Sequence, residues 1–478
     1  MNKFYITTPI YYATAKPHIG HAFATIYADV IARYKKLKKN ETFFTVGTDE
    51  HGINIEEKAI KAKKLPRDYV DEINSFYKKT WQELYIDYDD FIRTTEERHK
   101  KGVEKFINKL IKSKDVYKQK YEGLYCSSCE KFLTEKDLVN GLCPDHLKAP
   151  QKLTEENYFF NLKKYLPEIR KKIIKNELRI RPEARRKETL KMIDSGLADF
   201  SISREKVKWG IGYPGDKTQT VYVWVEALMN YVTILDFPDG EKFKKFWPAN
   251  LHIIGVEINK FHTIFWPALL LAIGESLPKE IFIHGLFTVN GQKMSKTIGN
   301  IIDPMTLIEK FGSDAVRYLL LSQFPASEHG DIKEELFIKK YNANLANGIG
   351  NLFERIFTLA INYKQKSGKN CDDEIKKFQE KTEFVYKEKM ENYLLYEALN
   401  EVFFFVKKLD QYIDFNKPWV LFKEKNPKAE KVLETLLFGA EKIIVWLSPF
   451  MPIKMEQAKK YLLNLNNQKE KLNLFPRL

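Results

Sequence analysis

The first 115 residues alternate between strand-like and helix-like segments, and this alternation limits the possible folds more than any other feature. Short apolar runs are typical of buried strands, and apolar positions recurring at helical spacing are typical of amphipathic helices. A strand–helix–strand order predicts a parallel sheet with helices on its faces. The predicted strands are 4–8, 42–46, 251–255 and 281–285, and the predicted helices are 21–36, 53–64, 68–85 and 260–274.

The alternation breaks and later resumes, which predicts one nucleotide-binding domain split by an insertion. We expect residues 1–115 and 216–290 to form its two halves and residues 116–215 to form the inserted domain. Residues 341–478 have only helical periodicity, which predicts an α-helical bundle, and residues 291–340 would connect it to the sheet. The predicted helices of the bundle are 341–363, 374–391, 393–412, 428–447 and 453–463.

Composition narrows the class of protein but does not decide its function. A net charge of +15 suits an acidic partner such as nucleic acid, although a general bias toward lysine would give the same balance. No apolar run approaches the roughly 18 residues that span a bilayer, and the N-terminus lacks the pattern of a secretory signal. We therefore expect a cytoplasmic protein without a membrane segment. Only 4 cysteines are present, which excludes a disulfide framework.

The segment Pro17-His18-Ile19-Gly20-His21 lies directly after the first predicted strand and opens the first helix. A helix N-terminus at the carboxyl end of a parallel strand offers free N–H groups to a phosphate. Gly20 would let a flat base or sugar approach the backbone, and the two histidines could donate to one ligand. Capping or core histidines, or a metal site with a ligand from elsewhere, are the alternatives.

A second basic motif, Lys293-Met294-Ser295-Lys296-Thr297, follows the strand at 281–285. Two lysines in a loop flanked by Gly291 and Gly299 can close on a triphosphate and stabilise charge that develops in the transition state. Taken alone, the motif could equally be a solvated basic loop.

Together the two motifs resemble the HIGH and KMSKS signatures of class I aminoacyl-tRNA synthetases, in order and in structural context. The resemblance implies a Rossmann-like parallel sheet and activation of an amino acid by ATP, accompanied by Mg²⁺. It extends over nearly the whole chain and is most specific to methionyl-tRNA synthetases. The segments that carry it are TPIYYATAKPHIGHA (8–22), GTDEHG (47–52), YDDFIRTTEERHK (88–100), LYCSSC (124–129), YVWVEALMNY (222–231), HIIGVEINKFHTIFWP (252–267), GQKMSKTIGN (291–300) and the terminal LFPRL.

The same resemblance implies a role for individual residues. Asp49 would hold the substrate ammonium, and aromatic and apolar side chains would surround the methionine side chain, whose sulfur packs well against aromatic rings. Tyr231 and His262 would add donors that the thioether can weakly accept. The implied catalytic residues are His18, His21, Lys293 and Lys296; the implied ATP contacts are Gly20, Glu257, Lys293, Met294, Ser295, Lys296 and Thr297; the implied methionine contacts are Ile10, Tyr12, Asp49, Trp224, Leu228, Tyr231, Ile258, His262 and Trp266.

Four positions depart from the family pattern. Val256 stands where a lysine is usual, which removes one expected contact to ATP. Glu257 replaces an aspartate whose implied partner is the ribose, and Glu226 replaces a second aspartate. Thr14 stands in place of an asparagine.

The spacing Cys126-x-x-Cys129 followed by Cys143-x-x-His146 is a strong zinc-ligand pattern. Four nitrogen and sulfur ligands close a tetrahedral site, so the predicted zinc is structural and stabilises a small polar insertion. A fortuitous cluster is the alternative. One subgroup of the family carries the same single knuckle.

The helical region is expected to contact the anticodon of tRNA-Met, both initiator and elongator. Asn347, Asn351 and Arg355 recur every four residues, and amide and guanidinium groups suit unstacked base edges. Pro418 and Trp419 would offer a flat surface for stacking. All five match anticodon-binding positions of the family; a solvated polar face with a core tryptophan is the alternative. The family's C-terminal dimerisation module is missing after LFPRL, which predicts a monomer.

Two other functions stay open at this stage. The chain could be a class I synthetase for another apolar amino acid, but the insertion is too short for the editing domain of the leucyl, isoleucyl and valyl enzymes. It could also be a tRNA-binding protein without catalysis, which the retained histidines and lysines of the two motifs argue against.

Overall fold

The chain folds into two compact units in the computed structural model. The described residues are 2–126, 130–133, 135, 138–144, 148–294, 300–365, 371–468 and 471–478, without the side chains of 131, 132, 293 and 466. The first unit comprises Met1–Pro17, Lys35–Thr80 and Asp87–His284; the second comprises His18–Tyr34, Trp81–Ile86 and Gly285–Leu478.

A parallel sheet forms the core of the first unit, as the sequence predicts. Its order is β2-β3-β1-β13-β14-β8, with β4 also paired to β3, and every pair that the described residues form in it is parallel. Residues 251–255 form a strand that is buried throughout, as expected for an apolar run covered on both faces. The strands are β1 (Lys3–Thr7), β2 (Tyr11–Tyr12), β3 (Glu41–Asp49), β4 (Asp90–Arg93), β8 (Arg179–Arg181), β13 (Leu251–Gly255) and β14 (Glu280–His284).

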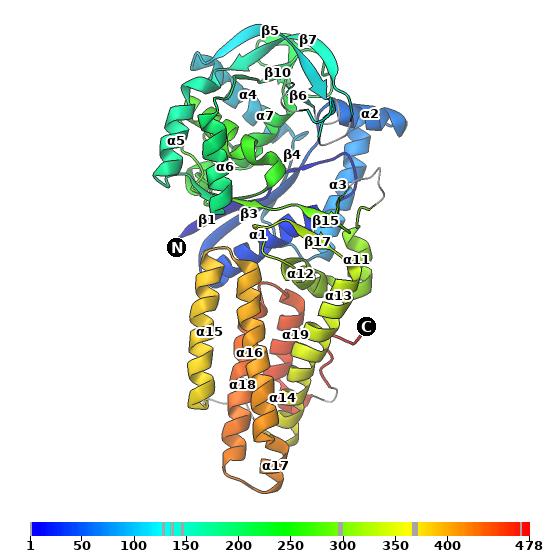
Figure 1. Ribbon diagram of the computed structural model, residues 1–478, viewed down its shortest axis with the longest axis vertical. Helices are drawn as coiled ribbons and strands as arrows, with labels where there is room; N and C mark the ends of the chain where they lie inside the picture. Colours follow the sequence, from blue (N-terminus) through cyan, green and yellow to red (C-terminus); the bar gives the residue numbers. More distant parts are fainter. Residues whose placement is uncertain are drawn as a thin grey trace. The chain divides into compact units, whose positions relative to one another are not determined.

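Strand β1 pairs with β13, although most of the first unit separates them in the chain. The two halves predicted from the sequence therefore meet in one sheet, and this junction is the position where α/β sheets of this kind bind ligands. The first unit also contains helices, of which Figure 1 labels α2, α3, α4 and α7. Its helices outside the predicted insertion are α2 (Ile53–Lys61), α3 (Pro66–Glu83), α4 (Glu97–Lys112), α7 (Val223–Leu228), α8 (Asn230–Thr233), α9 (Glu241–Phe246) and α10 (Trp266–Ala272).

The segment predicted as an insertion forms two antiparallel sheets together with residues 216–221, β6-β5-β7-β9 and β10-β12-β11, so the second sheet extends past the predicted boundary at residue 215. It is not wholly separate from the core, because β8 adds an edge strand to β14. Its strands are β5 (Val116–Cys126), β6 (Lys131–Leu133), β7 (Gln151–Phe160), β9 (Phe200–Ser201), β10 (Ser203–Arg204), β11 (Gly212–Tyr213) and β12 (Asp216–Val221), and its helices are α5 (Leu166–Ile174) and α6 (Glu183–Asp194).

The second unit contains a helical bundle, which confirms the prediction for the C-terminal region (Figure 1). Helices α14, α16 and α18 bury one apolar face each. The bundle helices are α13 (Glu334–Lys340), α14 (Asn351–Asn362), α15 (Asp373–Glu391), α16 (Leu395–Asn416), α17 (Pro418–Lys423), α18 (Lys428–Leu447) and α19 (Pro452–Leu463). The unit also holds most of α1 (Ile19–Leu37), the sheet of β15 (Phe287–Val289), β16 (Gln292–Lys293) and β17 (Gly330–Ile332), and α11 (Pro304–Phe311) and α12 (Ser313–Leu321).

Two segments predicted as regular helix are wound differently. Phe261–Phe265 and Tyr341–Gly350 form π-helical turns, each continued by an α-helix. Hydrophobic periodicity does not separate the two kinds of winding, and π-helical turns often occur at functional sites.

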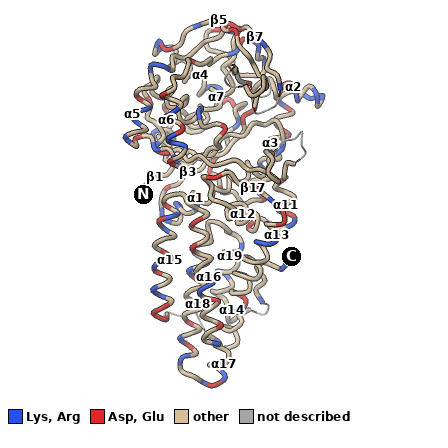
Figure 2. Tube along the Cα trace, in the orientation of Figure 1, with Lys and Arg blue, Asp and Glu red and all other residues tan. Residues whose placement is uncertain are grey.

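Charge and hydropathy add two observations. Figure 2 shows lysine and arginine interspersed with aspartate and glutamate along both units, so charge alone marks no nucleic-acid surface. Within the described part of the chain, no helix combines the length and the apolar character that crossing a membrane requires.

Candidate functional site

The two histidines of the first motif lie at the start of α1, with their rings stacked at 3.7 Å between centroids. The backbone N–H of Gly20 donates to His18 Nδ1 over 3.1 Å, and the backbone N–H of His18 donates to His21 Nδ1 over 3.2 Å. A nitrogen that accepts a hydrogen bond carries no proton, so each neutral ring holds its proton on Nε2. Both rings are thereby in the tautomer that can donate through Nε2.

Met294, in the described part of the second motif, lies beside the first motif in the second unit. A Cβ added at Gly20 would stand 3.5 Å from Met294 Cε, and the backbone N–H of Ile19 donates to Ile302 on the far side of the loop. Lys293 ends β16, where its backbone pairs with Thr288. The side chain of Lys293 and the residues Ser295, Lys296 and Thr297 lie outside the described part of the structure.

Asp49, at the carboxyl end of β3, is buried with its Oδ1 atom lacking a hydrogen-bond partner among the described residues. Burial raises the pKa of this carboxyl well above its ordinary value, and the charges of Glu226, Glu130 and Glu50 raise it further, against a hydrogen bond from the His51 backbone. An ionised carboxylate in such surroundings is costly unless a cation joins it. Asp49 is therefore placed to accept a positively charged ligand.

Two acids beside Asp49 already have cationic or ionisable partners. Glu226 is fully buried and contacts His51 Nδ1 and His99 Nε2, each at 2.7 Å. Burial acts to raise the Glu226 pKa, but the charges and hydrogen bonds of both histidines outweigh it and lower the pKa. Glu50 receives the Arg93 guanidinium at 2.7 Å. Asp49 has no comparable partner in the described residues.

Tyr231 and His262 form a buried hydrogen-bonded pair, with 2.7 Å between the tyrosine hydroxyl and Nε2. His262 Nδ1 lies 3.0 Å from the carbonyl oxygen of Ile258, which can only accept, so the ring proton is on Nδ1 and Nε2 accepts from Tyr231. Burial lowers the pKa of His262 to about 4, so the ring is neutral at pH 7. In this arrangement each proton is engaged by a neighbouring acceptor, and donation from these two groups to a thioether stays a prediction.

The predicted methionine contacts divide into enclosed and partly exposed side chains. Trp266 is fully buried, packs against Phe106 and Tyr231, and leaves its indole N–H without an acceptor in the described residues. Trp224 stacks on Phe261 with 4.7 Å between ring centroids. Leu228 is buried, whereas Ile10, Tyr12 and Ile258 are partly exposed, and all of these residues belong to the first unit.

Three of the four positions that depart from the family pattern follow core strands, whereas Glu226 lies in α7. Glu257 is exposed in a short 3₁₀ turn, Val256–Ile258, directly after β13. This is the carboxyl end of a strand, where α/β sheets bind ligands. Thr14 accepts the amine of Lys58 and the hydroxyl of Tyr69 through its backbone carbonyl, contacts that do not depend on its side chain.

The predicted zinc ligands are described only in part. Cys126, at the end of β5, and Cys143 are both buried and pack against each other and Leu133, and neither forms a disulfide within the described residues. Cys129 and His146 lie outside the described residues. The described residues contain no group of three histidine, cysteine or acidic side chains that could hold a metal ion. Two buried neighbouring thiols are compatible with half of a tetrahedral zinc site.

The predicted anticodon residues of the second unit fall into two environments. Asn347 and Asn351 are exposed and line a groove of about 580 Å³ together with the C-terminal segment 471–477. Arg355 instead contacts Asp410 and Asp414 of α16, each at 2.6 Å. Pro418 is buried at the start of α17, and the ring of Trp419 is 42% exposed.

Several residues of the site were not singled out from the sequence. His51 and His99 hold Glu226, and both lie in segments that carry the family resemblance. His252 packs its ring at 4.3 Å from Tyr231 and bonds Thr7 through Nδ1, with Nε2 lacking a partner among the described residues. Glu130, next to the first cysteine pair, contacts Tyr12 at 2.8 Å. The only signal in the sequence is that these residues lie in, or directly after, the segments that carry the family resemblance.

Comparison with known proteins agrees with this arrangement. Residues 4–153 and 146–357 match the model for class I tRNA synthetases (M), and residues 372–473 match the anticodon-binding domain of tRNA ligases. The chain is 41% identical to the methionine–tRNA ligase of Thermotoga maritima over 95% of its length and 74% of the relative's, and 42% identical to that of Clostridium perfringens over 94% and 71%. A Mycobacterium tuberculosis methionyl-tRNA synthetase solved with methionyl-adenylate superposes with a TM-score of 0.94 at 30% identity, covering 100% of both chains. The chain belongs to the methionine–tRNA ligase family of class I tRNA synthetases.

Proposed function

We propose that the chain is a methionine–tRNA ligase that activates L-methionine with MgATP and transfers it to the 3′ end of tRNA-Met, both initiator and elongator. Family membership supports the reaction class. The choice of methionine rests on the family, and the observation that carries an amino-acid substrate is the buried Asp49 carboxylate, with an unpartnered oxygen in the described residues and acidic neighbours. Only a cationic group such as the substrate ammonium complements it.

In the first step, a methionine carboxylate oxygen attacks the α-phosphorus of ATP. The new P–O bond forms as the bond to pyrophosphate breaks, giving methionyl-adenylate. His18 and His21 donate from Nε2 to phosphate oxygens, a role supported by the backbone contacts that fix both tautomers. Lys293 and Lys296 stabilise the charge that develops on the departing pyrophosphate.

The remaining ATP contacts and the methionine contacts hold the reactants in place. Gly20 leaves room for the nucleotide, Glu257 contacts the ribose, and Met294, Ser295 and Thr297 are the other proposed contacts to ATP. The methionine side chain lies against an apolar and aromatic wall with the neutral Tyr231–His262 pair beside it. The residues of this wall are Ile10, Tyr12, Trp224, Leu228, Tyr231, Ile258, His262 and Trp266.

In the second step, a hydroxyl of the terminal ribose of tRNA attacks the adenylate carbonyl, an ester forms and AMP leaves. We assign selection of the tRNA to Asn347, Asn351, Arg355, Pro418 and Trp419. The exposed amides in the C-terminal groove and the exposed Trp419 ring support hydrogen bonding and stacking to unpaired bases.

We also propose one structural zinc per chain, held by Cys126, Cys129, Cys143 and His146. The two buried, neighbouring thiols support it, and the metal when bound supplies folding free energy to the insertion rather than chemistry. We further propose a cytoplasmic monomer, which light scattering of the purified protein would test.

The first experiment is ATP–pyrophosphate exchange with a panel of single amino acids in the absence of tRNA. Exchange with methionine alone is expected. Exchange with another amino acid would retain the class and overturn the pocket assignment. No exchange with any amino acid, together with retained tRNA binding, would favour the noncatalytic alternative.

A further inference from the structure

Glu130 is a buried carboxylate of the insertion that contacts the start of a helix in the core of the first unit. It is 3% exposed and follows Cys129 directly in the chain. Its Oε1 atom accepts the Tyr12 hydroxyl at 2.8 Å and the backbone N–H of Asn54 at 2.7 Å. Asn54 lies in the first turn of α2, so one carboxylate oxygen joins this helix to the methionine contact Tyr12.

The backbone of Glu130 reaches a third part of the proposed methionine site. Its carbonyl oxygen accepts the Tyr222 hydroxyl at 2.6 Å. Tyr222 caps the N-terminus of α7, the helix that carries Trp224 and Leu228. The side chain of Glu130 therefore contacts Tyr12 and the start of α2, and its main chain contacts the residue that precedes α7.

The backbone at Gly52 is shaped to admit this carboxylate. A Cβ at this position would stand 2.5 Å from Glu130 Oε2 and 2.6 Å from the Tyr12 hydroxyl, and the residue has φ 108°. Gly52 follows Asp49 by three residues, and its N–H donates to the Trp209 carbonyl. The turn after Asp49 therefore packs so closely against Glu130 that a side chain at position 52 would clash with it.

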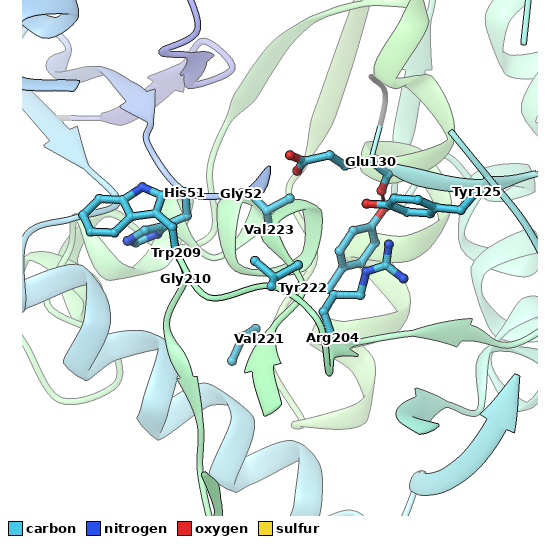
Figure 3. A pocket seen from close by; sticks show the side chains of 11 residues that line it. His51, Gly52, Tyr125, Glu130, Arg204, Trp209, Gly210, Val221, Tyr222 and Val223 are labelled. Carbon is cyan, nitrogen blue, oxygen red and sulfur yellow. Dashed lines mark hydrogen bonds between the residues drawn. The ribbon is translucent and has the colours of Figure 1, made fainter. Parts of the chain in front are cut away.

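Figure 3 shows Glu130 in the wall of a small cavity with Gly52, Tyr125, Arg204 and Tyr222. The Arg204 guanidinium lies over the rings of Tyr125 and Tyr222, at 4.5 Å and 5.0 Å, and contacts Glu155. These contacts fix the Tyr222 ring whose hydroxyl binds the Glu130 carbonyl. Within the described residues, the Glu130 carboxylate accepts hydrogen bonds only from a phenol and a backbone N–H. Tight packing around such a carboxylate suits a residue that positions its neighbours.

We propose that Glu130 is a positioning residue for methionine binding, holding Tyr12 and the turn after Asp49 in the geometry that receives the substrate. The inference rests on the proposed function and adds to it a residue of the insertion. The hydrogen bonds of the carboxylate come from neutral donors, so its positioning action depends on reach, whereas its charge acts separately by raising the pKa of Asp49.

Three substitutions separate reach from charge. Glu130→Gln keeps the length and an acceptor oxygen, Glu130→Asp keeps the charge but withdraws it from Tyr12, and Glu130→Ala removes both. Calorimetry of methionine binding without ATP should show Kd raised about tenfold for Ala and Asp, and within about threefold of wild type for Gln. In exchange assays the same variants should raise KM for methionine with little change in kcat or in KM for ATP.

Glu280→Gln is the matched control, because Glu280 is a buried glutamate of the same unit that lies at the amino end of β14 and contacts Arg181 instead of Tyr12. Its methionine Kd should stay at the wild-type value. If Glu130→Ala does not fold, the methionine Kd of Glu130→Asp provides the test instead. Kd within twofold of wild type for Asp overturns the proposal, and so does a Gln variant that loses as much affinity as Ala. Wild-type protein without methionine-dependent exchange would instead refute the proposed function.

Discussion

Arg317 in the second unit and Asp49 in the first are both buried, but among the described residues only Arg317 lies against a group of opposite charge. Each guanidinium nitrogen of Arg317 donates at least one hydrogen bond, and the group meets the buried Asp29 carboxylate at 2.6 Å. Asp49 has three acidic neighbours and an oxygen without a partner among the described residues. The acceptors of Arg317 are Asp29 and the carbonyls of Leu84, Pro449 and Phe450.

The difference separates a proposed binding residue from a structural ion pair by the way its charge is balanced. A compensated charge stabilises the fold only while both partners stay in place. An uncompensated charge costs stability in the free protein and gains its partner when ligand binds. Substitutions at the two positions should therefore have opposite effects on folding and on methionine binding.

The largest effect is expected for Arg317→Met. Removing the guanidinium leaves Asp29 and three carbonyls short of donors, at a cost of about 3–5 kcal/mol. The thermal transition should fall by about 10 °C, while the methionine KM of the folded protein stays unchanged. Arg33→Met, which removes a partly exposed partner of the same Asp29, is the control and should cost at most about 1 kcal/mol. Equal losses of stability for Arg317→Met and Arg33→Met would mean that the buried Arg317 contributes no more than a partly exposed partner of Asp29.

The next effect is expected for Asp49→Asn. Loss of the charge facing the ammonium should cost about 3 kcal/mol, a factor of about 100 in kcat/KM for methionine. The thermal transition should stay level or rise, because the variant no longer buries an uncompensated acid. Pyrophosphate exchange and calorimetric unfolding measure the two quantities. A variant that loses stability but retains exchange would make Asp49 a structural residue; exposed Asp239→Asn should change neither.

The pH dependence of methionine binding sharpens the same contrast. Burial and the charges of Glu226, Glu130 and Glu50 raise the pKa of Asp49 in the free protein, so Asp49 lowers stability as pH rises from 3.8 through that raised pKa. Bound ammonium lowers the pKa again, so methionine binding releases a proton and tightens with pH by at most about tenfold per unit. Calorimetry in buffers of different ionisation enthalpy detects this proton. In Asp49→Asn it should disappear.

The smallest effect is expected for Tyr231→Phe. It removes the hydroxyl that donates to His262 Nε2 and should cost about 1 kcal/mol in methionine binding. Because neither group offers a free proton to the thioether, the preference for methionine over norleucine should be modest and nearly unchanged in the variant. Exchange with both amino acids provides the ratio. A large loss of discrimination would mean that the hydroxyl donates to the sulfur.

The sequence predicted the parallel sheet and the bundle because their signals are local. The run at 251–255 is apolar throughout and forms β13 over the same residues. The neighbourhood of Gly20 and Met294 followed from two family motifs rather than from any local pattern. Such motifs imply proximity but do not give the tautomers of His18 and His21, which depend on backbone geometry.

Contacts between distant segments could not be derived from sequence patterns. Glu130 is one acid among many in the printed sequence, and its bond to Tyr12 exists only because β5 and β6 bring it to the core of the unit. Likewise, nothing in the residues at 260–274 distinguishes π-helical from α-helical winding. The internal hydrogen bond between Tyr231 and His262 depends on that winding and was not anticipated.

The π-helical turn at Phe261–Phe265 has a consequence for redesigning substrate choice. A π turn holds more residues than an α turn, so the direction in which His262 points relative to Trp266 depends on the number of residues as well as on their identity. Deleting one residue there would rewind the turn and rotate one wall of the pocket against the other. Libraries that vary the length of this turn would therefore reach amino-acid shapes that substitutions at a fixed length leave inaccessible.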